Sequence, residues 1–479
     1  MGKEFEADTL PSAHPVENSA GPPQHPCLFL ILAAHHPLTE PSRHSLAESD
    51  LVTLARGERS ITRRTEQGRR RLELQIPDPW MSSSVHARLF RHLGKWAIED
   101  TQSRNGTFVN GMPVARAFLV DGDIIELGHT FFLFREAVQV TSEDPLDEIV
   151  LPPIDRIPGL TTLWPPLAQQ FRALARVARS NVSVVIRGES GTGKELIARA
   201  VHLLSERPGA FVAINCGALP EALIESELFG HRKGAFSGAI EERPGLIRSA
   251  DRGTLLLDEI GELPAHAQVA LLRVLQERQV MPLGETRPLP VDLRLCAATH
   301  RDLDQLTADA TFRADLLARI SGFTLELPPL RERRQDLGIL VGDLLRRKMG
   351  PAASKISFTK AAIRVLLAHP WPLNIRSLEK TLERAVVLGG ENPIGPEHFP
   401  DSVRTPTPSL MEAWPGGRSA GSAIPLVEAQ EDDHRRAELL ALLAEHQGNI
   451  SAVARAMNKE RIQIRRWMRR YALSPESYR

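Results

Sequence analysis

The stretch VSVVIRGESGTGKELIARAVHLL, residues 182–204, decides the fold of the central part of this 479-residue chain. An apolar run ends at Arg187, the glycine-rich segment GESGTGKE follows over 188–195, and helical periodicity comes next. In such a strand–loop–helix, glycines let backbone N–H groups turn toward phosphate oxygens, and the helix N-terminus adds positive potential. The pattern predicts a phosphate-binding loop in an α/β domain; a glycine-rich turn before a helix is the alternative.

Lys194 would reach the β and γ phosphates of a bound ATP. Downstream, the apolar run GTLLLDEI, 253–260, ends in two carboxylates. Asp258 is expected to hold Mg²⁺, and Glu259 to polarise the attacking water. Glu195 stands where a Ser or Thr hydroxyl usually meets the metal, so Mg²⁺ must depend on other ligands or water. The ATP-binding positions expected in the loop are Gly188, Glu189, Ser190, Gly191, Thr192, Gly193, Lys194 and Glu195.

Composition excludes several classes of protein. Lys and Arg total 59, as do Asp and Glu, so the net charge gives no overall attraction to nucleic acid or membranes. Three cysteines without CxxC spacing argue against a disulfide framework or a zinc cluster. No apolar run is long enough for a transmembrane helix, and the start of the chain lacks the pattern of a secretory signal. We therefore expect a soluble, cytoplasmic protein.

Hydrophobic patterning predicts three folded domains. Short alternating runs such as LVTL, RLELQI and FFLF predict an all-β sandwich over 26–136. Apolar runs alternating with amphipathic helices predict a parallel α/β sheet over 157–400, and helical periodicity alone predicts an all-α domain over 431–479. Pro, Gly, Ser and acidic residues mark a flexible leader, 1–25, and two linkers, 137–156 and 401–430.

The central domain resembles the AAA+ domain of bacterial enhancer-binding proteins, the sigma-54-dependent transcriptional activators. Besides the two nucleotide motifs, it carries ELFGHRKGAFSGA, 227–239, which is similar to the family's GAFTGA loop that contacts sigma-54. The resemblance implies a P-loop ATPase with a helical lid, assembled as a homo-oligomeric ring. It assigns the sigma-54 contact to Gly234, Ala235, Phe236, Ser237, Gly238 and Ala239. Ser237 replaces the family's Thr; it keeps the hydroxyl and loses a methyl group.

Further positions match the family's catalytic and sensing residues. Asn215 in FVAINCGAL corresponds to the asparagine that restrains the catalytic glutamate, and Thr299 in CAATHRDL to the end of the sensor I strand, where His300 replaces the usual Asn. FRADLLARI, 312–320, supplies the two arginine fingers, Arg313 and Arg319. LPPLRERRQD, 327–336, is another family signature, and WPLNIRSL, 371–378, places sensor II at Arg376, with Leu373 in place of Gly.

The C-terminal segment resembles a Fis-type helix-turn-helix. Residues 448–473 hold seven Arg or Lys against one Glu, an electrostatic footprint suited to a phosphate backbone. Asn458 stands at the usual turn glycine and tolerates a left-handed backbone. A merely basic surface helix is the alternative reading. The residues expected to reach enhancer DNA are Arg461, Gln463, Arg465 and Arg466.

The N-terminal β domain resembles a forkhead-associated (FHA) domain. The matching segments are Arg56 after LVTLA, SSSVHARL with His86, DTQSRNGTFVNG and LVDGDIIELG. The resemblance implies that loops at one end of the sandwich hold a phosphothreonine peptide, while His86 braces them. The inferred binding residues are Arg56, Ser83, Arg104 and Asn105. The register is open between Ser82 and Ser83, and a purely structural sandwich is the alternative.

Together these motifs predict a transcriptional activator that binds enhancer DNA and uses ATP hydrolysis to remodel sigma-54 RNA polymerase for open-complex formation. Its regulation would pass through a phosphothreonine-containing protein bound to the FHA domain. An AAA+ remodeller of another protein or nucleic-acid target is the competing hypothesis. GAFSGA and the basic C-terminal helices favour the activator, because a generic remodeller requires neither.

Overall fold

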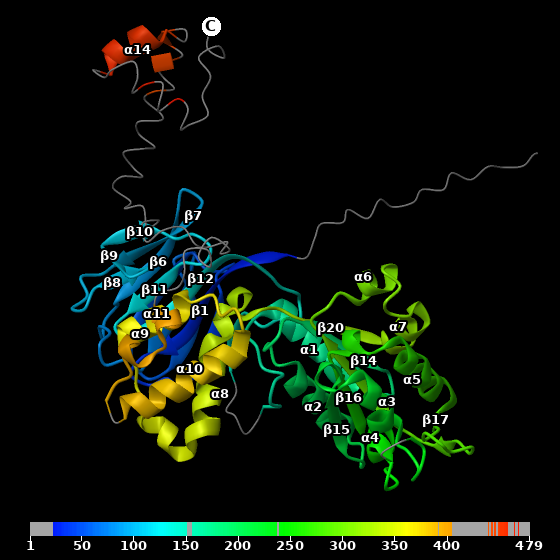
Figure 1. Cartoon of the computed structure of the whole chain (residues 1–479). Coiled ribbons are helices and arrows are strands. Elements are labelled where there is room, and N and C mark those ends of the chain that lie inside the picture. Colours follow the sequence, from blue (N-terminus) through cyan, green and yellow to red (C-terminus); the bar gives the residue numbers. More distant parts are fainter. Residues whose placement is uncertain are drawn as a thin grey trace, which may run out of the picture.

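The computed structural model describes residues 23–150, 156–236, 239–390 and 392–404, together with 439, 442–443, 445–446, 449–457, 464 and 468 near the C-terminus. Figure 1 shows three bodies in this main part: a β domain, a parallel α/β domain and a group of lid helices beside the β domain. The first two confirm the predicted all-β sandwich and central α/β domain. No helix among the described residues is both long and apolar enough to cross a membrane.

The β domain is a sandwich of two sheets, antiparallel apart from the parallel pairing of β3 with β5. The larger sheet contains, in spatial order, β13 (Asp147–Ile149), β2 (Ser42–Ser45), β1 (Gln24–Ala33), β12 (Thr130–Gln139), β11 (Ile124–Leu127), β8 (Thr107–Val109) and β9 (Met112–Val114). The smaller contains β10 (Arg116–Phe118), β7 (Lys95–Asp100), β6 (Ala87–His92), β3 (Leu51–Arg56), β5 (Arg69–Ile76) and β4 (Ser60–Glu66). Alternating apolar side chains of the two sheets fill the space between them.

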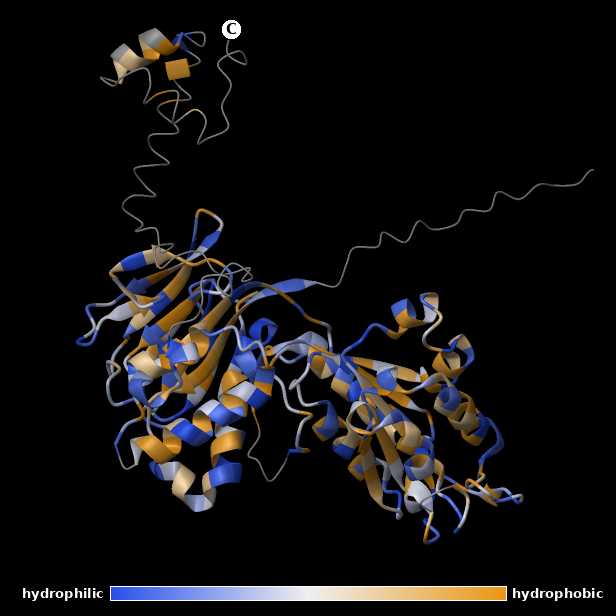
Figure 2. Cartoon of the chain, in the orientation of Figure 1, coloured by the Kyte–Doolittle hydropathy of each residue, from blue (hydrophilic) through white to orange (hydrophobic). Residues whose placement is uncertain are grey.

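The α/β domain has a five-stranded parallel sheet. In spatial order its strands are β15 (Phe211–Asn215), β16 (Thr254–Asp258), β19 (Arg294–Thr299), β14 (Val184–Gly188) and β20 (Phe323–Leu327). The helices of this domain are α1 (Pro165–Ala178), α2 (Lys194–Ser205), α3 (Glu221–Phe229), α4 (Gly245–Ser249), α5 (Ala265–Glu277), α6 (Leu303–Ala308) and α7 (Ala314–Ile320). Because both faces are covered, the strands are almost continuously apolar, as Figure 2 shows.

The lid follows β20 and comprises α8 (Leu337–Met349), α9 (Lys360–Ala368), α10 (Asn374–Gly389) and the short α11 (Asp401–Arg404). Its apolar faces do not form a separate core. They join buried residues of β1 and β12, so one hydrophobic cluster runs from the outer face of the larger β sheet into the lid. Gly338 marks the closest approach, since a Cβ at this position would collide with the carbonyl oxygen of Ile31.

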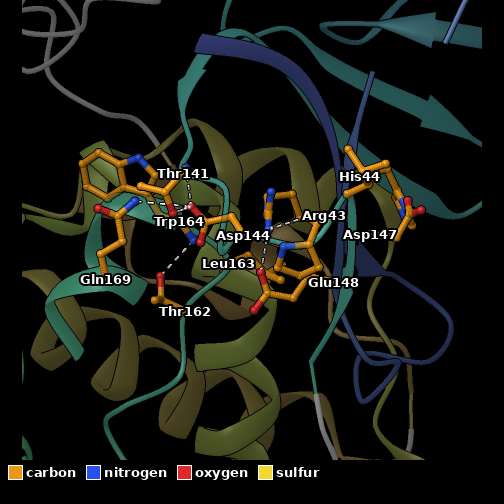
Figure 3. A network of polar contacts seen from close by, with 12 residues as sticks. Arg43, His44, Thr141, Asp144, Asp147, Glu148, Thr162, Leu163, Trp164 and Gln169 are labelled. Carbon is orange, nitrogen blue, oxygen red and sulfur yellow. Dashed lines mark hydrogen bonds and ion pairs between the residues drawn. The ribbon is translucent and has the colours of Figure 1, made fainter. Parts of the chain in front are cut away.

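The segment 137–156, for which the sequence suggests a linker, contributes the end of β12 and the whole of β13. β13 pairs antiparallel with β2. His44, in β2, donates through Nδ1 to Asp147 over 2.8 Å, and its Nε2 lies 2.9 Å from the Ser42 hydroxyl. Arg43 of the same strand donates to Glu148 over 2.9 Å. The residues of two of these contacts, His44 with Asp147 and Arg43 with Glu148, are labelled in Figure 3, and the contacts explain why an acidic, proline-containing segment adds to the sheet.

The same segment is tied to the α/β domain, which in turn is tied to the lid. The buried carboxylate of Asp144 accepts hydrogen bonds from Thr141 and from Gln169 and Arg172 of α1. Farther along, Asp336 at the start of the lid accepts from the Thr162 hydroxyl over 2.6 Å and from the backbone N–H of Leu163 over 2.8 Å. The β domain, the α/β domain and the lid are therefore joined by specific side-chain contacts as well as by the covalent chain.

Near the C-terminus, the described residues include one helix, α14 (Ile450–Ala456), within the predicted helical domain. Leu439, Leu443, Val453, Ile464 and Met468 are buried against one another. A small apolar cluster of this kind is what short packed helices require. The predicted turn residue Asn458 and the four predicted DNA-contacting residues lie outside the described residues.

Candidate functional site

The phosphate loop leaves the C-terminal end of β14 and leads into α2, where strand, loop and helix follow one another as the motif requires. Gly191 and Gly193 have φ values of +79° and +102°, which residues with a Cβ rarely adopt. Lys194 is buried, and its Nζ donates to the carbonyl oxygens of Gly188, at 2.9 Å, and Glu189, at 3.3 Å. Its ammonium group is therefore held at the mouth of the loop by backbone carbonyls that phosphate oxygens can replace.

Glu195 lies on the exposed side of α2. Its carboxylate accepts two hydrogen bonds from Arg199, one turn along the helix, at 2.7 and 3.0 Å. This i, i+4 pair accounts for the acidic residue in the first turn, where a carboxylate is also favoured by the helix dipole. Glu195 is thus paired with Arg199, while its negative charge still helps to raise the pKa of Asp258.

Asp258 and Glu259 stand at the end of β16, next to the phosphate loop. Burial raises the pKa of Asp258, and the neighbouring charge of Glu259 raises it further. Lys194 counters this effect and lies 3.7 Å from a carboxylate oxygen of Glu259. A half-buried carboxylate with an acidic neighbour is a suitable ligand for a divalent cation. Among the described residues no cluster of three or more His, Cys, Asp or Glu side chains could hold a metal ion.

Glu259 has its shortest contact with His300. Oε2 of Glu259 lies 2.7 Å from Nδ1 of His300, and the backbone N–H of His300 points to the same oxygen at 3.4 Å. Asn215 is the residue that by resemblance would restrain this glutamate. On β15 it pairs in register with Asp258 of β16. Its side chain, however, accepts a hydrogen bond from the backbone N–H of Gly217. His300, at the position where the family usually has Asn, is thus in direct contact with Glu259, and the restraining role inferred for Asn215 stays a prediction.

The lid holds the phosphate loop from the other side. Glu189 accepts two hydrogen bonds from Arg331, at 2.6 and 2.9 Å, and a third from Asn374. A Cβ on Gly191 would collide with the carbonyl oxygen of Leu373, and the Gly191 carbonyl accepts from the backbone N–H of Ile375. The nucleotide loop is therefore docked directly on the lid. Sequence reasoning did not assign these roles to Arg331 and Asn374, although both lie in the quoted signatures LPPLRERRQD and WPLNIRSL.

The sensor residues occupy different positions around the loop. Arg376, near the start of α10, donates to the Ser190 hydroxyl over 3.2 Å, so the proposed sensor II lies at the phosphate loop. Thr299 is fully buried at the end of β19 and accepts from the backbone N–H of Arg301. Leu373, which replaces the family's Gly, has φ −105°, a conformation open to any residue. The left-handed conformations of this turn fall on Trp371 and Asn374 instead.

Arg313 and Arg319 lie at the two ends of α7, and both are exposed. Arg313 forms a bidentate pair with Asp315, at 2.7 and 3.0 Å, and Arg319 donates to the carbonyl oxygen of Leu275. Within the described residues neither guanidinium contacts the phosphate loop of its own chain. Exposed guanidinium groups away from the site of their own subunit are what arginine fingers acting on a neighbour require.

The segment predicted to contact sigma-54 is a loop between α3 and α4. His231 forms β-bridges with Arg243 and Leu283, which fix the base of the loop beside the β17 (Gln279–Val280) and β18 (Leu289–Pro290) hairpin. Phe236 is 39% exposed, and its ring meets His231 edge-on at 5.0 Å. Ser237 and Gly238 lie outside the described residues. The loop therefore presents an aromatic side chain on a well-anchored base.

The inferred phosphopeptide residues lie at the end of β3 and on loops of the β domain. Arg56 and Ser83 are exposed, as is Arg104. Arg56 donates to the carbonyl oxygen of Pro79 over 3.1 Å, and Asn105 donates to that of Trp80 over 2.7 Å. Two of the four inferred residues, Arg56 and Asn105, thus donate to neighbouring carbonyl oxygens of the segment that follows β5.

His86 lies beneath this surface as the resemblance implies. It is fully buried; its Nδ1 accepts from the backbone N–H of Ser82, and its Nε2 lies 3.2 Å from the carbonyl oxygen of Gly106. The imidazole thereby connects the two loops that carry Ser83 and Asn105. Burial lowers its pKa, which is consistent with a neutral, structural histidine.

Three family models match the chain. The sigma-54 interaction domain matches residues 162–326, the AAA+ ATPase lid domain matches 331–414, and the FHA domain matches 65–128. These matches cover the α/β domain, the lid and about half of the β sandwich.

Curated relatives match over about two thirds of the chain. The acetoin catabolism regulatory protein of Cupriavidus necator is 42% identical over 68% of this chain and 48% of its own length. Regulatory protein AtoC of Escherichia coli is 41% identical over 66% of this chain and 70% of its own length. Among solved structures, NtrX from Brucella abortus in complex with ATP is 30% identical, with a TM-score of 0.46, over 65% of this chain and 68% of that chain.

Proposed function

The chain belongs to the sigma-54-dependent transcriptional activators, and we propose that it couples ATP hydrolysis to the opening of promoters by sigma-54 RNA polymerase. It carries an AAA+ ATPase domain with its lid and an N-terminal FHA domain. The observation that supports the activity best is the convergence of Lys194, Asp258 and Glu259 around the phosphate loop. We place this activity in the cytoplasm, where DNA and the polymerase meet.

The hydrolytic roles follow from the charges at the site. When ATP binds, its phosphates compete with the Gly188 and Glu189 carbonyls for the Lys194 ammonium group. Asp258 would hold Mg²⁺, which neutralises charge on the phosphates. Once Lys194 turns to the phosphates, Oε1 of Glu259 is free to accept a proton from the attacking water, while His300 keeps Oε2 in place. The other proposed nucleotide-sensing residues are Asn215, Thr299 and Arg376.

The catalytic site would be completed by a second subunit of a homo-oligomeric ring. Arg313 and Arg319 are exposed on α7 and do not contact their own phosphate loop. A guanidinium supplied by a neighbour stabilises negative charge on the transferring phosphoryl group. We therefore assign these two residues as arginine fingers in trans.

Phe236 and its loop are the proposed contact with sigma-54. An exposed aromatic residue on a loop with an anchored base is suited to partner contact, because burial of the ring in an interface is favourable. The match to the sigma-54 interaction domain supports this assignment over a remodeller of another target, since the match includes this loop.

Enhancer DNA would be bound by the C-terminal domain through Arg461, Gln463, Arg465 and Arg466. The net positive charge of residues 448–473 supports binding to a phosphate backbone, and the apolar cluster around Val453 supports a small helical domain. The FHA domain would supply the regulatory input by binding a phosphothreonine peptide. Exposed Arg56 and Arg104 provide charge for the phosphate, Ser83 a hydroxyl, and Asn105 an amide for the peptide backbone.

The decisive experiment separates hydrolysis from its output. We expect Lys194→Ala to abolish ATP turnover, and Phe236→Ala to retain turnover but lose open-complex formation on a sigma-54 promoter. Val387→Ala, which removes an apolar side chain from α10 that is 80% exposed, against 39% for Phe236, is the control and should retain both activities. If Phe236→Ala still forms open complexes, the sigma-54 contact is wrong; if Lys194→Ala hydrolyses ATP normally, the catalytic assignment is wrong.

A further inference from the structure

The face of the FHA domain that carries the inferred phosphopeptide residues borders the lid of the ATPase. The backbone N–H of Phe358, just before α9, donates to the carbonyl oxygen of Ala34 at the end of β1 over 2.7 Å. Glu126 of β11 is 1% exposed and forms a bidentate pair with Arg364 of α9, at 2.6 and 2.7 Å. Together with the shared apolar cluster, these contacts fix the start of α9 beside this end of the sandwich.

An aromatic platform lies next to Asn105 on the same face. Trp80, 41% exposed, stacks on His129 with ring centroids 3.9 Å apart. The fully buried Asp78 accepts hydrogen bonds from the backbone N–H groups of both Trp80 and His129, and from the Thr130 hydroxyl. Since Asn105 donates to the Trp80 carbonyl oxygen, the platform and the inferred peptide-binding amide are directly connected. The platform is therefore held in place before any ligand arrives.

Lys360, the first residue of α9, extends from the lid toward this face. Its Nζ lies 5.0 Å from the centre of the Phe108 ring. The Phe108 ring lies against the loop that follows Asn105: a Cβ atom added to Gly106 would be 3.7 Å from the nearest atom of this ring. Burial lowers the pKa of His129. The negative charge of Asp78 raises this pKa, and the positive charge of Lys360 lowers it. Lys360 is therefore close enough to the platform for its charge to act on it.

The charge of Lys360 has no acidic counterpart. Lys360 forms no ion pair with any residue that the structure describes, whereas the neighbouring Arg364 is fully engaged with Glu126. Arg56 and Arg104 on the adjoining loops add further positive charge. The face thus offers two regions of positive charge, one on the FHA loops and one contributed by the lid, with an exposed aromatic platform between them.

We propose that Lys360 of the ATPase lid forms part of the phosphopeptide-binding face and recognises a second acidic group, a carboxylate or another phosphate, on the same peptide. This inference rests on the proposed phosphopeptide binding by Arg56, Ser83, Arg104 and Asn105. The bound peptide then touches two domains at once, with its phosphothreonine on the FHA loops and its second charge on α9. Peptide binding is thereby linked to the lid, whose residues Arg331 and Asn374 hold the phosphate loop.

The test uses the full-length protein and an oriented phosphothreonine peptide library, in which Asp, phosphoserine, Ala or Lys is fixed in turn at each position flanking the phosphothreonine. The unchanged protein should prefer Asp or phosphoserine at one position. Lys360→Ala should lose that preference: its affinity for the acidic peptide should fall about two- to five-fold, the effect of removing an exposed charge pair. The variant should still require the phosphothreonine. Lys360→Arg should keep the preference. Lys355→Ala removes an exposed lysine from the same lid and should behave like the parent.

Each outcome has a distinct meaning. If Lys360→Ala keeps the acidic preference, or if the unchanged protein shows none while still requiring phosphate, the role of Lys360 is wrong and the phosphopeptide function stands. If the unchanged protein binds no peptide in a phosphate-dependent manner, the phosphopeptide function is wrong and the inference fails with it. Arg56→Ala, which should lose binding to all phosphorylated peptides, distinguishes the two sites.

Discussion

Oε2 of Glu259 is held by Nδ1 of His300 at 2.7 Å, and this contact gives the carboxylate that we propose as catalytic one fixed and one available oxygen. The available oxygen, Oε1, lies 3.7 Å from Nζ of Lys194, which the phosphates of ATP would draw away. A general base needs both a free acceptor oxygen and a defined orientation. His300 supplies the orientation from a position where the family usually has Asn.

We expect His300→Ala to lower kcat for ATP about ten-fold and to leave KM little changed, because the substitution releases the carboxylate without touching the nucleotide. His300→Asn keeps a donor and should retain most of the activity. Steady-state ATPase assays check both variants, with Asn215→Ala as the comparison. An unchanged kcat in His300→Ala, together with a reduced kcat in Asn215→Ala, would return the positioning role to Asn215.

Removing the bidentate contact between lid and phosphate loop should weaken nucleotide binding. Arg331→Ala is expected to raise the dissociation constant for ATP about three-fold, since the pair with Glu189 is partly exposed. Glu189→Ala should have a larger effect, because it also removes the acceptor of Asn374. In a double-mutant cycle the two effects should be less than additive. Full additivity in fluorescent-nucleotide titrations would show that the two side chains act independently.

The pair between the buried Glu126 and the partly exposed Arg364 should stabilise the packing of the β domain on the lid. Arg364→Ala leaves the Glu126 carboxylate buried without a partner, so we expect a loss of about 2 kcal/mol in the free energy of unfolding. Adding Glu126→Gln should recover part of this loss, because the uncompensated charge is removed. Arg347→Ala, which breaks an exposed pair with Glu379, should cost less than about 0.5 kcal/mol. Urea unfolding measures all three; equal losses for Arg364→Ala and Arg347→Ala would contradict the assignment.

The anchoring of β13 should depend on pH. Although burial opposes ionisation of Asp147, hydrogen bonds from His44 and Arg63 lower its pKa to about 2, below its usual value of 3.8. A carboxylate whose folded pKa is depressed stabilises the fold above its unfolded pKa and loses this effect as the pH falls toward the folded value. Asp147→Asn should therefore cost about 2 kcal/mol at pH 7, and the difference from the parent should narrow between pH 4 and pH 2. Denaturation curves recorded across this range, with the exposed Asp121→Asn as control, provide the check.

Much of the architecture could be predicted from local patterns. Alternating runs such as LVTL and RLELQI coincide with β3 and β5, and the fully apolar run before Asp258 is β16. Period-two alternation marks a strand with one buried face, whereas a fully apolar strand has both faces covered. These signals are contained within a few neighbouring residues, which is why the sandwich and the parallel α/β domain could both be recognised.

Contacts between residues far apart in the sequence could not be predicted in the same way. β13 looked like a linker because its acidic residues suggest solvent, but Arg43 and His44, about a hundred positions earlier, supply the groups that bind them. At the nucleotide site, the motifs specify Lys194, Asp258 and Glu259, whereas the partner of Glu259 depends on how β16 and β19 lie beside each other. His300 was therefore noted as a departure from the family pattern, and its contact became visible only in the folded chain.

The burial of β1 on both faces has a consequence for how such a protein can evolve. Phe29 and Ile31 face the lid cluster while Leu28 and Leu30 face the interior of the sandwich, so the N-terminal domain carries half of an interface whose other half lies some three hundred residues later. Exchanging this domain for another by gene fusion would expose that half and leave Gly338 opposite an ill-fitting strand. The β domain and the lid are thus expected to be inherited as a pair, and successful chimeras should join two parents after α11, beyond the lid, rather than at the acidic segment before the ATPase.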